Sequence, residues 1–150
     1  MIEYGIWLLC GILLLVIVSF HYEVMMTVSD RLVPWLEKRL PHRRVIALSL
    51  AGLMLGHIVE IWLFSLALML TAQFPSVGSI QGDFSGRWGD YLYLSTVNYT
   101  SLGDSSIRIA GHIRAVVASE TLVGMMMIAW SASYTFLKME QGWRARHPNS

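Results

Sequence analysis

The chain has 150 residues, of which 55% are hydrophobic and 14% are charged, with a formal net charge of +1 and a single cysteine, Cys10. A soluble domain usually carries about a quarter charged residues, so this composition, with apolar runs of about twenty residues, indicates an integral membrane protein. With this small net charge nothing argues for nucleic acid, and no nucleic-acid partner is expected; one cysteine excludes an internal disulfide.

The first apolar stretch predicts a transmembrane helix within residues 1–28. The run GIWLLCGILLLVIVSF is apolar on every face. Met1-Ile2-Glu3 before it is not the basic region of a signal peptide, and no small-x-small cleavage site follows it. We therefore interpret it as a retained N-terminal helix.

Residues 29–44 predict a basic cytoplasmic loop or interfacial helix. The segment SDRLVPWLEKRLPHRR carries five Lys and Arg residues, and Pro34 and Pro41 flank a short amphipathic piece. The excess of positive charge favours the cytoplasmic side of a membrane. Binding of anionic lipid at residues 31–44 is an alternative role for the same charges.

Residues 45–72 predict a second transmembrane helix that contains two ionisable residues. His57 and Glu60 are three residues apart and share a helix face. Ionisable side chains at this depth usually face protein or water and mark functional sites. Two roles stay open: a proton sensor or gating pair, or a hydrogen bond to the first span through His21 or Glu23.

The region after the second span predicts a segment that enters the membrane without crossing it. A Gly-, Ser- and Pro-containing loop leads to residues 88–100, a helix too short to span, and then to the polar run TSLGDSS. Backbone at membrane depth must be paired or must line water. Residues 111–139 predict a third span, and the basic tail, 140–150, is assigned to the cytoplasm, with the N-terminus outside.

The predicted fold class is therefore an all-α membrane protein with three transmembrane helices plus a re-entrant helix and loop. The loop would line an ion path, since carbonyl and hydroxyl oxygens can replace part of the hydration shell of a cation. A single re-entrant loop cannot enclose a pore, so the residues also favour an oligomer.

Two stretches resemble a known family. The run YLSTVNYTSLG, residues 93–103, resembles the pore helix and filter of potassium-channel-like proteins, and ETLVG with WSAS, residues 120–124 and 130–133, resembles the inner helix of small bacterial two-transmembrane ion channels. The resemblance implies a homotetramer in a bacterial inner membrane, with residues 45–139 as the pore domain and the first span around its outside. Within that domain it implies a pore helix at 88–100 and a filter at 100–105.

The filter expected from this resemblance departs from the potassium signature. Its residues are Thr100, Ser101, Leu102, Gly103, Asp104 and Ser105. Gly-Asp-Ser-Ser stands where potassium filters have Gly-Tyr-Gly-Asp. Either Asp104 replaces the Tyr, similar to the filter of the non-selective sodium–potassium channel, or Tyr-Gly is deleted and Asp104 is the acid at the mouth. Both remove carbonyl rings, which predicts weak selection of K⁺ over Na⁺ and a possible Ca²⁺ or Mg²⁺ site at the mouth.

Five further residues receive supporting roles. Glu120 is expected to accept a hydrogen bond from the pore helix or filter loop, and Asn98 is expected to support the filter. Gly124 is either an inner-helix hinge or a packing residue. Ser131 and Ser133 either line the lower pore or link helices by hydrogen bonds.

The leading functional hypothesis is a weakly selective channel for K⁺ and Na⁺, with no cofactor beyond the permeant cations. The alternatives are a potassium-selective channel of the same fold and a non-conducting structural or regulatory membrane subunit. No enzymatic activity is expected. An intramembrane metalloenzyme that uses His57 and Glu60 would need a third ligand, and the chain has no H-E-x-x-H motif.

Overall fold

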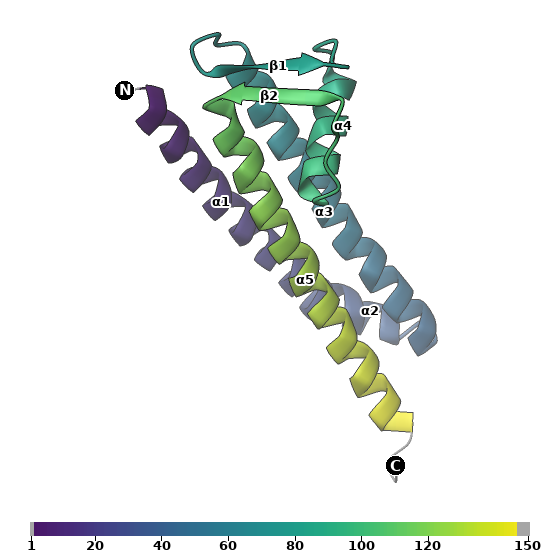
Figure 1. Cartoon of the computed structure of the whole chain (residues 1–150). Helices are drawn as coiled ribbons and strands as arrows, with labels where there is room; N and C mark the ends of the chain where they lie inside the picture. The colour runs from purple at the N-terminus through teal and green to yellow at the C-terminus, as the bar shows by residue number, and fades with distance from the viewer. Residues whose placement is uncertain (1, 147–150) are drawn as a thin grey trace.

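A computed structural model describes residues 2–146, and the side chains of residues 3–144 (Figure 1). Met1 of the predicted N-terminal segment and residues 147–150 of the predicted tail lie outside this range. The helices are α1 (Ile2–Thr27), α2 (Val33–Glu37), α3 (His42–Ala72), α4 (Trp88–Tyr99) and α5 (Ile113–Arg146). Two strands are present in the described chain, β1 (Gly78–Gly82) and β2 (Ile107–Gly111).

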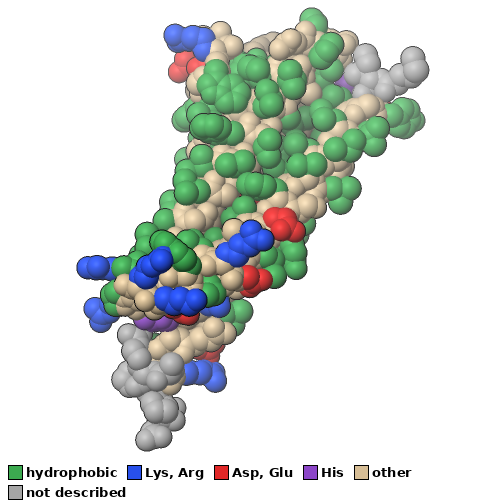
Figure 2. Space-filling view, turned by 180° about the vertical axis from the view of Figure 1, so that it is seen from behind, with side chains coloured by type: hydrophobic (Ala, Val, Ile, Leu, Met, Phe, Trp, Pro, Cys, Tyr) green, Lys and Arg blue, Asp and Glu red, His purple; other side chains and the backbone are tan. Residues whose placement is uncertain are grey.

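Three helical stretches are long and apolar enough to cross a membrane: Glu3–Glu37, His42–Ala72 and Ile113–Arg144. Figure 2 shows hydrophobic side chains over most of one face of the molecule, with Lys and Arg gathered toward one end. Apolar side chains exposed along whole helices are suited to lipid rather than to water. The prediction of a mostly helical, multi-pass membrane protein is therefore supported in its main feature.

The basic segment continues the first helix instead of forming a separate loop. A π-helical turn, Val28–Leu32, joins α1 to α2, and Pro34 occupies the first turn of α2. A π-turn followed by proline bends a helix, and Figure 1 shows the chain turning there toward the start of α3. Val33 and Leu36 are buried, whereas Trp35 is exposed and carries the Arg39 guanidinium over its ring.

Two glycines let α1 and the π-helical turn after it pack closely on α3. A Cβ atom at Gly56 would lie 2.9 Å from Cγ1 of Val24, and one at Gly52 would lie 3.2 Å from Val28. The Gly-x-x-x-Gly spacing places both glycines on one helix face, which is a common way for membrane helices to approach each other. The first span therefore packs directly on α3.

The small antiparallel sheet was not expected from the sequence. β1 pairs with β2 from Gly78 opposite Gly111 to Gly82 opposite Ile107. Figure 1 shows the sheet at the end of the bundle where α5 begins and α3 ends. Because the two strands flank residues 83–106, the sheet holds both ends of that stretch, α4 included, at the same end of the molecule.

The interior consists of two hydrophobic clusters with polar side chains between them. The cluster toward the sheet includes Ile17, Phe64, Leu68, Tyr99, Val116, Val123 and Met127. The cluster toward the basic end includes Val28, Val33, Leu36, Val45 and Leu53. Between them in the chain lie His21, Glu60 and Ser131, all buried. Buried polar groups need partners, so this polar layer is where the candidate site begins.

Candidate functional site

Helix α4 runs back along α3 from the sheet end and stops level with the middle of α3. Each step of four residues down α4 matches a step of four residues on α3, which is about 6 Å of helix rise. The contacts are Ser65 Oγ to the Tyr91 carbonyl at 3.4 Å, Ser95 Oγ to the Ile61 carbonyl at 2.9 Å, and Tyr99 Oη to His57 Nδ1 at 2.8 Å. Since α3 runs from residue 42 to residue 72, His57 is its midpoint.

From this mid-level point the chain returns to the sheet through an exposed polar segment. Thr100, Ser101, Leu102, Gly103 and Ser105 are exposed and Asp104 is half-buried. Ser101 and Gly103 have positive φ angles of 61° and 68°, and the Gly103 amide donates to the Val97 carbonyl at 2.9 Å. Glycine takes this backbone conformation without steric cost, whereas serine does not. The predicted filter residues thus form one continuous surface strip.

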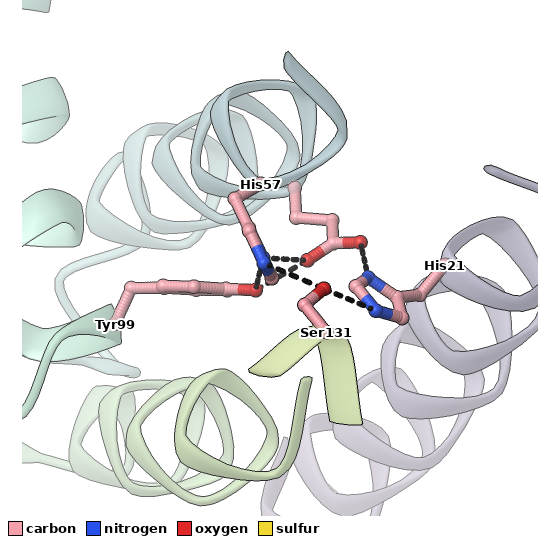
Figure 3. Close-up of polar contacts among 5 residues, drawn as sticks. His21, His57, Tyr99 and Ser131 are labelled. Carbon is pink, nitrogen blue, oxygen red and sulfur yellow. Dashed lines mark hydrogen bonds and ion pairs between the residues drawn. The ribbon is translucent and has the colours of Figure 1, made fainter. Parts of the chain in front are cut away.

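Five buried or half-buried side chains, among them Tyr99, the residue before the strip, meet between the helices (Figure 3). We call them the polar cluster: His21 from α1, His57 and Glu60 from α3, Tyr99 from α4 and Ser131 from α5. Glu60 Oε1 lies 2.8 Å from His21 Nδ1 and Glu60 Oε2 lies 3.3 Å from His57 Nδ1. Tyr99 Oη donates to Glu60 Oε2. Every long helix and α4 contribute to the cluster.

Ser131 closes the cluster on the side opposite Glu60. Its Oγ lies 3.1 Å from His57 Nε2 and 3.2 Å from His21 Nε2. The two imidazole rings therefore stand side by side, with centroids 5.0 Å apart, each spanning from the carboxylate to the serine (Figure 3). His21, Glu60 and Ser131 are almost fully buried, while the His57 side chain is 16% exposed.

The cluster is complete as a hydrogen-bonded unit. Among the described residues, His21, His57 and Glu60 are the one group of metal-ligand type whose ligand atoms lie within 4.8 Å of one another. All four of their ring nitrogens already face a protein oxygen at 3.3 Å or less. In these contacts each ring nitrogen either carries a proton or uses its lone pair to accept a hydrogen bond, so none is left to coordinate a metal ion. The geometry therefore favours proton chemistry over metal binding.

Glu120 contacts Ser95 of α4, within the predicted pore helix, but the proton count makes it the donor rather than the predicted acceptor. This residue of α5 is fully buried, and its Oε1 is hydrogen-bonded to Ser95 Oγ of α4, while its Oε2 has no partner. Ser95 has one hydroxyl proton, and its other neighbour, the Ile61 carbonyl, can only accept. If Ser95 donates to the Ile61 carbonyl, the proton between Ser95 and Glu120 must come from Glu120. Glu120 is then a neutral acid, which also suits its buried position.

Gly124 is the point where α5 touches the end of α4. A Cβ atom there would lie 2.3 Å from the carbonyl oxygen of Tyr99. Real side chains do not tolerate that distance, so glycine is required for this helix contact. The packing role considered for Gly124 thus has a definite partner, the residue that precedes the exposed strip.

Asp104 is held in place at the sheet side of the strip. Its Oδ1 accepts from the Ser106 hydroxyl at 2.7 Å and the Ser106 amide at 2.8 Å, and its Oδ2 accepts from Tyr93 Oη at 2.9 Å. These hydrogen bonds hold the pKa of Asp104 below its usual range, and the bond from the Ser106 hydroxyl has the largest effect, followed by those from the Ser106 amide and Tyr93. The side chain therefore presents a fixed negative charge at neutral pH.

Two of the predicted residues lie apart from these contacts. The Asn98 side chain donates to the Leu94 carbonyl within α4 at 2.9 Å, so this hydrogen bond does not support the strip. Ser133 is exposed, and its hydroxyl donates to the Ala129 carbonyl at 2.9 Å. Of Ser131 and Ser133, Ser131 is the one that links helices.

Four of the five residues of the polar cluster are named from the sequence, and one is missed. His57 and Glu60 are predicted as a pair, with His21 as one of two possible partners in the first span, and Ser131 is predicted either to line the lower pore or to link helices. Tyr99 was not assigned a role, although it follows Tyr91 and Ser95 at intervals of four residues and therefore shares their helix face. That spacing was the available signal.

Comparison with known proteins gives no relative for this chain. No family model, no curated protein and no solved structure matches it.

Proposed function

We propose that the protein conducts cations through a pore that several copies of the chain form around residues 100–105. The observation that carries the proposal is the depth of the exposed strip. It starts beside Tyr99, level with the midpoint of α3, and returns to the end from which α4 came. If α3 crosses the bilayer, this exposed polar backbone lies within it.

Such backbone is stable at that depth only beside water or inside protein. In one chain the strip is on the surface, with the Leu102 side chain 79% exposed. Other copies of the same chain, placed around a shared axis, would cover the strip and would leave a water-filled path along it. The resemblance of residues 93–103 to potassium-channel-like proteins supports this interpretation and favours four copies.

The chemistry of the strip suits cations. Its hydroxyl and carbonyl oxygens are hard ligands, and Asp104 places one fixed negative charge per chain at the sheet side. With Gly103 followed directly by Asp104, few consecutive carbonyl rings are available to strip water from an ion. We therefore propose a channel for K⁺ and Na⁺ that selects weakly between them.

The first test is cation flux in liposomes that contain the purified protein. We expect K⁺ and Na⁺ to pass, and we expect the flux to fall when residue 103 is changed in Gly103→Val, because valine disfavours a φ of 68°. Gly86→Val is the matched control, since Gly86 also has a positive φ, 77°, but lies in the loop before α4. Absence of flux at every pH and osmotic condition would support the non-conducting alternative and would contradict the proposal.

Selectivity is tested separately by reversal potentials with K⁺ on one side and Na⁺ on the other. Weak selection predicts a reversal near zero. A reversal close to the potassium equilibrium potential would identify the potassium-selective alternative and would contradict weak selection while leaving the pore itself in place.

A further inference from the structure

The polar cluster contains five positions at which one hydrogen atom must lie between two electronegative atoms. Four are single contacts: His21 with Glu60, His21 with Ser131, His57 with Ser131, and Tyr99 with Glu60. The fifth is the Nδ1 atom of His57, which faces Tyr99 Oη at 2.8 Å and Glu60 Oε2 at 3.3 Å and can share one proton between them.

The ordinary protonation states supply only four protons for these five positions. Each neutral imidazole has one N–H, Tyr99 and Ser131 have one O–H each, and an ionised Glu60 has none. With both histidines neutral and Glu60 ionised, one of the five positions has no hydrogen however the four protons are placed. Two lone pairs then face each other inside the protein, either beside Ser131 or beside Tyr99 and Glu60, which is unfavourable.

We propose that the polar cluster is a binding site for one proton, held as an imidazolium on one of the two histidines beside the Glu60 carboxylate. With this fifth proton each position contains one hydrogen. In one arrangement His21 donates to Glu60 and to Ser131, Ser131 donates to His57, His57 donates to Tyr99, and Tyr99 donates to Glu60. Hydrogen bonds then close a ring through the four helices α1, α3, α4 and α5.

The net charge of the cluster also favours one bound proton. One imidazolium and one carboxylate give zero net charge, which is the least costly state for a site where His21 and Glu60 are completely buried. Removing the proton leaves a net negative charge, and adding another leaves a net positive one. The site therefore favours one proton over none or two.

The surrounding helices bring little further charge to the site. Glu120 on α5 is within electrostatic reach of Tyr99, but it is a neutral acid by the contact it makes with Ser95. On α1, Glu23 is exposed on another face. The indole ring of Trp130 packs against His21 at 5.7 Å between centroids. His57, at 16% exposed, is the member through which a proton can enter.

Binding of the proton completes the contacts that join the helices at the cluster. All five contacts are made at the same time only when the fifth proton is present, and each of them joins two helices. Loss of the proton opens one of these contacts and loosens one helix from its neighbour. On the basis of the proposed channel function, in which α5 lies beside the path, this change makes conduction dependent on pH.

Nitrogen-15 NMR of the histidine side chains, in protein reconstituted in lipid, tests the proton count directly. The chain has five histidines, so spectra of His42→Gln, His112→Gln and His147→Gln assign the remaining two. At pH 7 we expect one cationic and one neutral imidazole in the pair, and loss of one proton when the pH is raised. Two neutral or two cationic imidazoles at pH 7 would overturn the proposal.

Ser131→Ala tests the origin of the extra proton, with Ser133→Ala as the matched control on the same helix. Without Oγ, two neutral histidines and Tyr99 satisfy every remaining position. We expect the midpoint of proton release to fall by at least about one pH unit, a tenfold loss of proton affinity. Ser133 bonds only to its own helix, so Ser133→Ala should leave the midpoint unchanged. Equal midpoints in wild type and Ser131→Ala would overturn the proposal.

The same variants separate this proposal from the channel function. If the protein conducts, the pH dependence of flux should shift in Ser131→Ala in step with the NMR midpoint and stay constant in Ser133→Ala. Flux that is independent of pH while the NMR titration shifts would overturn the link to conduction. If no variant conducts, the NMR result still decides the proton site.

Discussion

At the scale of single residues, Gly124 and Tyr99 fix where the exposed strip begins. The Tyr99 carbonyl would lie 2.3 Å from any Cβ at position 124, and the Tyr99 hydroxyl is bound to Glu60 and His57. One residue is therefore held from both ends, by α5 through its backbone and by α3 through its side chain. This double restraint holds the turn at Thr100 at a fixed depth.

Gly124→Val should push the end of α4 away from α5. Overpacking of this kind costs about 1–3 kcal/mol, and we expect that loss in the free energy of unfolding in detergent, together with reduced flux. Gly11→Val on α1 is the control, because nothing lies within 4 Å of a Cβ there. Equal stability of the two variants would contradict the close contact.

Asp104 should keep its charge well into the acidic range. Its pKa is lowered by hydrogen bonds from Ser106 and Tyr93. The stabilisation of the folded protein by these hydrogen bonds is therefore fully present above the ordinary aspartate pKa of about 3.9. It is lost as the pH falls through the lower pKa of Asp104 in the folded protein. We expect Ca²⁺ block of the flux to be the same at pH 7 and pH 5, and to weaken in Asp104→Asn at both.

Asp83→Asn provides the control for this prediction, because Asp83 is an exposed acid just after β1. A block that weakens equally in the two variants would show a general effect of surface charge rather than a site at Asp104.

At the scale of elements, the long helices could be predicted from the sequence and their partners could not. Apolar runs determine a span by length alone, so the segments that contain α1, α3 and α5 were evident. The sheet was not, because β1 and β2 are five residues each, contain glycine, and pair across 24 intervening residues. Likewise, His57 and Glu60 were visible as one helix face, but Ser131 reaches them only through packing of α5.

The docking of α1 on α3 depends on Gly56. We expect Gly56→Leu to separate the helices, because a Cβ there already lies 2.9 Å from Val24, and so to break the His21–Glu60 contact one turn away. The expected cost is about 1–3 kcal/mol in the free energy of unfolding. Ala51→Leu, on the exposed face of α3, should be near neutral.

A double-mutant cycle makes this prediction specific. If Gly56→Leu removes the contact of His21 with Glu60, then adding His21→Gln should cost much less than it does in the wild type. Additive costs would mean that α1 keeps its position in Gly56→Leu, contrary to the packing described.

At the scale of the whole molecule, the bundle is arranged around one segment, residues 83–106, which leaves the sheet, reaches the middle of α3 and returns to the sheet. The sheet holds the two ends of residues 83–106 together, α4 carries the chain to the level of the polar cluster, and the strip returns it. The spans, the basic end and the polar strip could be predicted from composition and pattern. The depth of the strip could not, since it depends on the register of α4 against α3.

The central claim is that residues 100–105 line a cation path, and block by a thiol reagent tests it most directly. In a Cys10→Ala background, a cationic methanethiosulfonate should reduce flux through Ser105→Cys, because the added group would occupy the path. Gln81→Cys, exposed on β1 at the same end, should be modified without loss of flux. Mass spectrometry would show modification of both. Modified Ser105→Cys protein with unchanged flux would contradict the claim.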